Sequence, residues 1–267
     1  MLSIDAFLAR RGSQKVSEEI SSPTFSEIGK AAIAYQLMQC EDEAKLLSDH
    51  DDHWYQHLWS RINDSLEEFG SNQLRIISFN YDRSLEHYLL MSLQNAFGVT
   101  AERAGEELRK IPFLHVYGQL GGLPEMKFQG LDTRRYISNA LASSQIASAA
   151  SGIRVIDEHR DDDEIFAQAY GLLANAQRIC FIGFGFDDTN VRRLQLAKLT
   201  NSNSSDFQAY ATTFGLATAE RQKVIQLIYK KMPTALAVIK RQETDVNISP
   251  YSPYKTDQYL KSAGVLF

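Results

Sequence analysis

Hydrophobic positions recur with two different patterns along this chain, and the change falls near residue 74. Before that point, the apolar residues of Thr24–Leu47 and Trp54–Phe69 return every three or four positions, which predicts amphipathic helices. Ser22-Pro23 is a plausible start for the first of them, since proline is favoured in the first helical turn. After residue 74, short apolar runs alternate with helical segments, a pattern typical of a mostly parallel sheet.

The alternating part of the chain predicts a series of strands and helices with one long interruption. The predicted strands are 75–79, 113–117, 153–156, 178–183, 207–212 and 235–239. The predicted helices are 83–97, 103–110, 162–177, 189–199, 218–232 and 253–263. Region 119–152 is rich in Gly and Ser without a strong period, so we expect a long excursion or a small inserted subdomain there.

Composition narrows the class of protein. A chain of 267 residues with 44% hydrophobic and 23% charged residues is typical of a soluble globular protein. The net charge of -5 argues against a protein that grips phosphate backbones, so direct nucleic-acid binding is not expected. We also expect no membrane segment, because no apolar run approaches the roughly 20 residues of a membrane helix. We expect no signal peptide, because the N-terminus lacks the order of charged, apolar and small residues that such a peptide has.

Cysteine and histidine usage points away from metal chemistry. Cys40 and Cys180 alone rule out a four-cysteine zinc site and favour a reducing, cytoplasmic setting, with Cys180 expected as a buried structural thiol. His50, His53 and His57 cluster near two aspartates, and His53 and His57 share a helical face. The cluster has no H-E-x-x-H motif and no clear third ligand, so we predict no metal site.

The stretch R-I-I-S-F-N-Y-D-R-S-L-E at 75–86 joins a predicted strand directly to a predicted helix. Its polar residues follow the strand's carboxyl end, where open α/β sheets bind ligands. Asn80 and Asp82 point to the same side if the strand continues, because strand side chains alternate. The alternative is that Asp82 or Ser84 simply caps the following helix.

Two further strand ends carry similar residues. His115 lies within F-L-H-V-Y-G, either as a catalytic group or as a core histidine with satisfied hydrogen bonds. The strand at 178–183 runs into G-F-G-F-D-D-T-N and a helix that Asp188 or Thr189 is expected to cap. Gly183 and Gly185 allow backbone N–H groups to approach a phosphate or ribose, or they form only a tight turn.

In combination, F-N-Y-D, then H-x-Y-G on a strand, then F-I-G-F-G-F-D-D-x-N resembles the sirtuin-like domains of bacterial NAD-consuming defence proteins. S-I-D-A-F-L at 3–8, E-I-G-K-A-A-I-A at 27–34 and W-Y at 54–55 are similar to the helical region of that family. The resemblance implies an α/β fold: a Rossmann-like, mostly parallel core over 71–267 with an added N-terminal helical layer over 1–70, forming one domain over 1–267.

The resemblance also implies an activity and its residues. It implies hydrolysis of NAD⁺ to nicotinamide and ADP-ribose in anti-phage defence, by a homo-oligomer or with a partner protein of the defence system. Asn80 would orient the reacting groups beside the nicotinamide ribose, and His115 would be the general base. The cofactor-binding residues would be Asp82 at the nicotinamide pocket and, at the adenosine half, Gly183, Gly185 and Asn190. We expect these residues to share one cleft at the carboxyl ends of neighbouring strands.

One departure from the family pattern lowers the expected activity. Family members begin with a strand and a G-A-G-x-S loop that cradles the pyrophosphate, whereas Met1 of this chain matches a point beyond that loop. We therefore expect a shortened member, or one completed by another polypeptide, with weak NAD binding and slow turnover. The family's zinc ribbon is also absent, which disfavours protein deacylation. Two alternatives stay open: a module that binds NAD or ADP-ribose without cleavage, and an interaction protein that self-assembles through residues 1–70.

Overall fold

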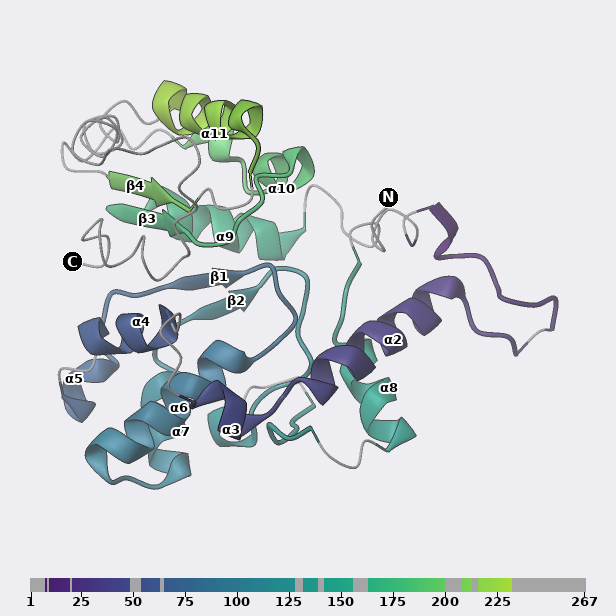
Figure 1. The fold of residues 1–267 in the computed structure, drawn as a ribbon, viewed down its shortest axis with the longest axis horizontal. Coiled ribbons are helices and arrows are strands. Elements are labelled where there is room, and N and C mark those ends of the chain that lie inside the picture. The colour runs from purple at the N-terminus through teal and green to yellow at the C-terminus, as the bar shows by residue number, and fades with distance from the viewer. Residues whose placement is uncertain are drawn as a thin grey trace. The chain divides into compact units, whose positions relative to one another are not determined.

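The computed structural model describes most of the chain up to residue 231 (Figure 1). The described residues are 8, 10–19, 21–48, 54–62, 65–127, 132–138, 142–155, 163–199, 208–212 and 216–231. The predicted strand at 235–239, the predicted helix at 253–263, and His50 and His53 lie outside them.

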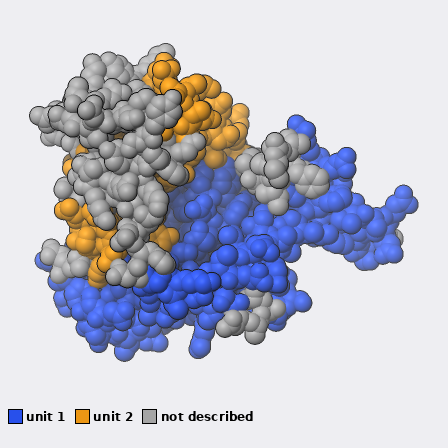
Figure 2. All heavy atoms as spheres, viewed as in Figure 1, with its two compact units in different colours: residues 1–49, 62–160 blue, residues 50–61, 161–267 orange. Residues whose placement is uncertain are grey.

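The chain divides into two compact units (Figure 2). Unit 1 comprises Met1–Asp49 and Ile62–Arg160, and unit 2 comprises His50–Arg61 and Asp161–Phe267. Residues 50–61 therefore group with the C-terminal part of the chain rather than with the rest of the predicted helical layer. The single domain over 1–267 stays a prediction.

Unit 1 contains a parallel pair of strands, β1 (Ile76–Ser78) and β2 (Phe113–His115). The chain between them forms α6 (Ser84–Phe97) and α7 (Ala101–Leu108), which pack on each other. The buried leucines of α6 recur at helical spacing, as do the apolar positions of α7, and Thr100 caps the start of α7 through its side chain. This β-α-α-β segment confirms the predicted elements at 75–79, 83–97, 103–110 and 113–117.

The N-terminal part of unit 1 is helical, as predicted, but with different boundaries. It forms α2 (Phe25–Gln39), α3 (Glu43–Leu46) and α5 (Leu66–Phe69). The prediction of a start at Ser22-Pro23 is wrong, because Thr24 occupies the N-cap and forms a capping box with Glu27.

Helix α2 packs against α8 (Ser143–Ser151) within unit 1 (Figure 1). Their shared core is formed by small and medium side chains, namely Ala34, Met38, Leu120, Ala149, Ala150 and Ile153. The 119–152 region thus contains a helix, and also the short 3-10 turn η1 (Pro124–Met126). The apolar pattern did not reveal α8 because its sequence, S-S-Q-I-A-S-A-A-S, has one large apolar residue.

The predicted strand at 153–156 is wrong. Ile153 makes only an isolated antiparallel bridge with Gly118, and both Ile153 and Val155 are buried. Gly118 has φ +78°, and an added Cβ would lie 1.9 Å from the carbonyl oxygen of Gly152, so only glycine fits this crossing. The apolar run therefore reflects core packing rather than a strand ladder.

Unit 2 contains the second parallel pair, β3 (Arg178–Phe181) and β4 (Gln208–Ala211). Its helical elements are α4 (Trp54–Ile62, all but the last residue in this unit), α9 (Glu164–Ala174), α10 (Asp188–Arg193), η3 (Leu196–Lys198) and α11 (Thr218–Lys231). The predicted helix 189–199 is interrupted at Gln195, whose φ of 51° is left-handed.

The described residues therefore form a mixed α/β structure with two small parallel sheets, ordered β1-β2 and β3-β4. In each sheet, helices lie between the two strands in the chain, which is the usual crossover connection between parallel strands.

Candidate functional site

The ends of β1 and β2 bring two of the predicted catalytic residues together. Ser78 pairs with His115 in the parallel register, and Asn80 follows β1 by two residues. The ring nitrogen Nδ1 of His115 lies 2.9 Å from the backbone oxygen of Asn80. This contact joins residues 35 apart in sequence, and it confirms that Asn80 and His115 are neighbours in the fold.

Glu86 completes the surroundings of His115 from the first turn of α6. Its carboxylate oxygen Oε1 lies 2.6 Å from Nε2 of His115, and both side chains are about 95% buried, with exposed fractions of 5% and 4%. Both ring nitrogens therefore face an oxygen acceptor, one a carbonyl and the other a carboxylate. A ring that donates from both nitrogens is the charged imidazolium, and Glu86 pairs its charge.

The protonation of His115 follows from these partners. Burial lowers the pKa of His115, but the hydrogen bond and charge of Glu86 outweigh it, and the net pKa is raised above the usual 6.5. The backbone oxygen of Asn80 and the charge of Asp82 act in the same direction. The result is a buried carboxylate–histidine pair that holds a proton between the end of β2 and the first turn of α6.

Glu86 was missed in the sequence, although a signal was present. It lies on the same helical face as Leu89, Leu90 and Leu93, at i+3, i+4 and i+7 spacing. A carboxylate on the apolar face of a helix has to find a buried partner or lose its charge. That position marks Glu86 as a residue with a specific role.

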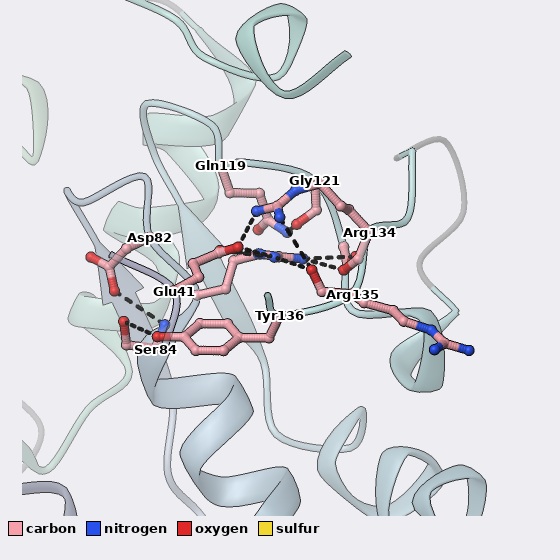
Figure 3. Close-up of polar contacts among 10 residues, drawn as sticks. Glu41, Asp82, Ser84, Gln119, Gly121, Arg134, Arg135 and Tyr136 are labelled. Carbon is pink, nitrogen blue, oxygen red and sulfur yellow. Dashed lines mark hydrogen bonds and ion pairs between the residues drawn. The ribbon is translucent and has the colours of Figure 1, made fainter. Parts of the chain in front are cut away.

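Asp82 acts as a local cap in this structure. Its carboxylate oxygen accepts a hydrogen bond of 3.1 Å from the backbone N–H of Ser84 (Figure 3). This agrees with the capping alternative, although the N-cap position itself belongs to Arg83. Because β1 ends at Ser78, the expected strand alternation does not extend to Asn80 and Asp82.

A buried ion cluster lies around the same turn. Arg83 and Glu41 pair through a two-pronged contact. Arg134 also contacts the Glu41 carboxylate (Figure 3). The hydroxyl of Tyr136 donates to Ser84 at 3.1 Å. The sequence patterns did not identify this cluster, since its members come from three separate segments.

Comparison with protein families, with characterised proteins and with solved structures finds no match to this chain. The assignment of the site therefore rests on its geometry.

Among the described residues, no group of three or more His, Cys, Asp or Glu side chains is placed to hold a metal ion. No helix in the described ranges combines the length and the apolar character needed to cross a membrane.

The remaining predicted residues belong to unit 2. Gly183 follows β3 with φ +61°, and its N–H donates to the Thr212 hydroxyl at 2.8 Å, so this amide is already engaged. Gly185 has no such φ, and among the described residues no atom lies within 4 Å of an added Cβ. Asn190 lies within α10, whose N-cap is Asp187 rather than Asp188 or Thr189.

The predicted site residues are thus divided between the two units. Asn80, Asp82 and His115 meet around one turn of unit 1, whereas Gly183, Gly185 and Asn190 follow β3 in unit 2. A single cleft that includes all six stays a prediction.

Proposed function

We propose that this chain is the catalytic domain of an NAD⁺ glycohydrolase, which cleaves NAD⁺ to nicotinamide and ADP-ribose. The observation that supports the proposal is the buried Glu86–His115 pair, held against Asn80 at the ends of two parallel strands. Glycohydrolases need an acid–base group at the reacting carbon, and a carboxylate-paired histidine is suited to that work.

The proposed reaction assigns a defined task to this pair. The bond between the ribose C1′ and the nicotinamide nitrogen breaks, and its electron pair goes to the nicotinamide ring. Water attacks the oxocarbenium-like C1′ and gives up a proton to Nδ1 of neutral His115, which for this step has to face the water instead of the backbone oxygen of Asn80. The overall reaction is NAD⁺ plus water to nicotinamide, ADP-ribose and a proton. Because only the neutral ring accepts a proton, we expect the rate to rise with pH through the raised pKa of His115.

We further propose a Rossmann-like fold for the chain. Each parallel strand pair with its helical connection is the repeating part of such a fold. We propose that Asp82 lies at the nicotinamide pocket and that the adenosine half is bound by Gly183, Gly185 and Asn190. A cytoplasmic setting in bacterial anti-phage defence, as a homo-oligomer or with a partner protein, completes the proposal.

The test is nicotinamide release from NAD⁺ by the purified chain, followed by chromatography. His115→Ala and Asn80→Ala should each lower the rate by about 10² to 10⁴-fold, the usual contribution of a positioned acid–base group. Glu106→Gln serves as a control, because Glu106 pairs with Arg103 on the exposed face of α7. An unchanged rate in His115→Ala would remove the catalytic assignment, and no release by the wild type would refute cleavage by this chain.

Gly185 offers a test of the adenosine assignment that leaves the acid–base pair untouched. Neither backbone conformation nor crowding by described residues requires glycine there, so Gly185→Ala should not change thermal stability. If a ligand approaches this backbone closely, the added methyl group will weaken NAD⁺ binding in calorimetry. Equal binding by the variant and the wild type would contradict the assignment.

A second candidate function is favoured by a specific observation. Both nitrogens of His115 already have acceptors within the protein, so the ring offers no lone pair to water in this arrangement. That state fits a module that binds NAD or ADP-ribose without cleaving it. Calorimetric binding of ADP-ribose together with no nicotinamide release would establish this alternative over the first.

A further inference from the structure

Arg83 is one of the most deeply buried side chains of the described residues, and its charge is fully engaged. The Arg83 side chain is 1% exposed and that of its partner Glu41 is 2% exposed. Nε and Nη2 of Arg83 donate to Oε1 of Glu41 at 3.0 and 2.8 Å, and Nη2 also lies 2.9 Å from Oε2. Such a two-pronged contact fixes the orientation of both groups, which a lysine cannot reproduce.

The remaining donors of the Arg83 guanidinium bind backbone oxygens that are distant in sequence. Nη1 donates to the backbone oxygens of Gly122 and Arg134 at 3.2 and 2.6 Å, and Nη2 donates to that of Arg135 at 3.3 Å. All five N–H donors of the guanidinium therefore have acceptors. Arg83 thus ties together Glu41 after α2, the start of α6, and the backbone at Gly122 and at 134–135.

The start of α6 is also where the acid–base pair begins. Arg83 immediately precedes α6, and Glu86 lies three residues later, within the first turn. Glu86 reaches His115 at 2.6 Å, a short contact that a small displacement of the helix would lengthen. Because a helical turn is rigid on this scale, whatever fixes Arg83 also fixes the origin of the Glu86 side chain.

We propose that the Glu41–Arg83 ion pair is a positioning element for the acid–base pair, holding the first turn of α6 so that Glu86 stays in contact with His115. The inference deepens the proposed function and rests on it for the role of His115 in proton transfer. Neither Glu41 nor Arg83 contacts His115, so both act through Glu86.

The test follows the His115 imidazole by NMR in the 267-residue chain as pH is varied. The chain has six histidines, and His115→Gln identifies the signal. Glu86→Gln serves as the reference for complete loss of the carboxylate–histidine contact. It should lower the pKa of His115, because the Glu86 charge that raises this pKa is removed while the burial that lowers it remains. Glu41→Gln should lower the pKa of His115 in the same direction and by a large part of the reference change.

Arg83→Lys is the second variant, because it keeps the positive charge and removes the two-pronged contact of the guanidinium with Glu41. Arg83→Lys should also lower the pKa of His115. It serves as the test of the proposal if Glu41→Gln does not fold. Glu106→Gln changes an ion pair with Arg103 whose side chains are 50% and 46% exposed, and it should leave the pKa of His115 unchanged. An unchanged pKa of His115 in a folded Glu41→Gln or Arg83→Lys variant would overturn the proposal, even if the melting temperature fell.

Nicotinamide release separates this proposal from the proposed function. If the wild type releases none, the proposed function fails, whereas the NMR titration still reports whether Glu41 and Arg83 position the pair. If the wild type is active, Glu41→Gln should lower kcat with little change in KM, by on the order of 10²-fold, the cost of a small displacement of catalytic groups. A change confined to KM would contradict a role in positioning the acid–base pair.

Discussion

His115 and His87 are both buried, yet their surroundings shift their protonation in opposite directions. His115 faces a carbonyl oxygen and a buried carboxylate, and its pKa is raised above 6.5. His87 stacks on Tyr136 with ring centroids 4.2 Å apart, and Nε2 lies 2.9 Å from Oε2 of Glu43. Glu43 is 48% exposed, so burial prevails over its charge and lowers the pKa of His87. The two buried histidines thus differ in protonation because the partner of His115 is a buried carboxylate, whereas His87 has a half-exposed carboxylate and the nearby positive charge of Arg83.

The raised pKa of His115 predicts a loss of stability at higher pH. The folded protein binds the His115 proton more tightly than the unfolded chain does, so this stabilisation is fully present below pH 6.5. It is lost as pH rises through the raised pKa. Unfolding in urea at several pH values should show this decline in the wild type and a flatter profile in Glu86→Gln. Parallel profiles would mean that Glu86 does not set the protonation of His115.

His87 predicts the opposite trend on the acid side. Its pKa is lowered in the folded state, so the unfolded chain takes up this proton first, and stability falls as pH drops below 6.5 towards the lowered value. His87→Phe keeps a flat ring against Tyr136 and removes the titration. The variant should therefore lose less stability than the wild type over this range in the same urea experiment. An equal loss would assign the acid sensitivity to other groups.

At the scale of elements, α6 depends on how it ends as well as on where it begins. Gly98 follows its last residue with φ +62°, and its N–H donates to the Gln94 oxygen at 2.9 Å. No described atom lies within 4 Å of an added Cβ, so the requirement for glycine comes from the backbone alone. Gly171 in α9 is also uncrowded, but its φ is not in the left-handed region.

These two glycines predict opposite effects of the same substitution. Gly98→Ala should lower the free energy of unfolding by about 1 kcal/mol, because a left-handed conformation is unfavourable for alanine. Gly171→Ala should raise it by about 0.5 to 1 kcal/mol, because alanine favours a helix interior. Denaturant unfolding of both variants measures the difference. A stabilising Gly98→Ala would show that α6 does not end in the left-handed conformation.

At the scale of the whole molecule, each unit carries one thiol. Cys40 caps the end of α2 in unit 1 and is exposed. Cys180 lies in β3 of unit 2, and burial raises its pKa to about 12. Only the thiolate reacts with alkylating reagents, so the two cysteines differ in reactivity for a structural reason.

The thiols therefore report separately on the two units. In the native protein, iodoacetamide near neutral pH should modify Cys40 and leave Cys180 unmodified for as long as β3 and β4 stay paired. Increasing urea should expose Cys180 together with the loss of secondary structure. Mass spectrometry of tryptic peptides distinguishes the two sites. Alkylation of native Cys180 at the rate of Cys40 would contradict the burial that raises the pKa of the Cys180 thiol.

Four of the six predicted strands could be placed from the sequence, because a run such as R-I-I-S-F or R-I-C-F-I-G carries its strand preference within a few residues. The neighbourhood of Asn80 and His115 also followed from the sequence, since parallel strands end at the same edge of a sheet. The strand at 153–156 and the helix α8 were not predicted correctly. The apolar residues Ile153 and Val155 are buried in the core without forming a strand with ladder hydrogen bonds. The sequence of α8 differs too little in hydrophobicity between its positions to show a helical period.

The sequence by itself determined the local elements: the positions of β1, β2, β3 and β4 to within a few residues, and the turns that carry polar residues. The tertiary structure decided the partners of those polar residues. Glu86 reaches His115 across 29 positions and Glu41 reaches Arg83 across 42, and no local pattern records which buried charge meets which. The physical reason is that strand and helix preferences act over a few residues, whereas the pairing of buried charges depends on which segments the folded core brings together.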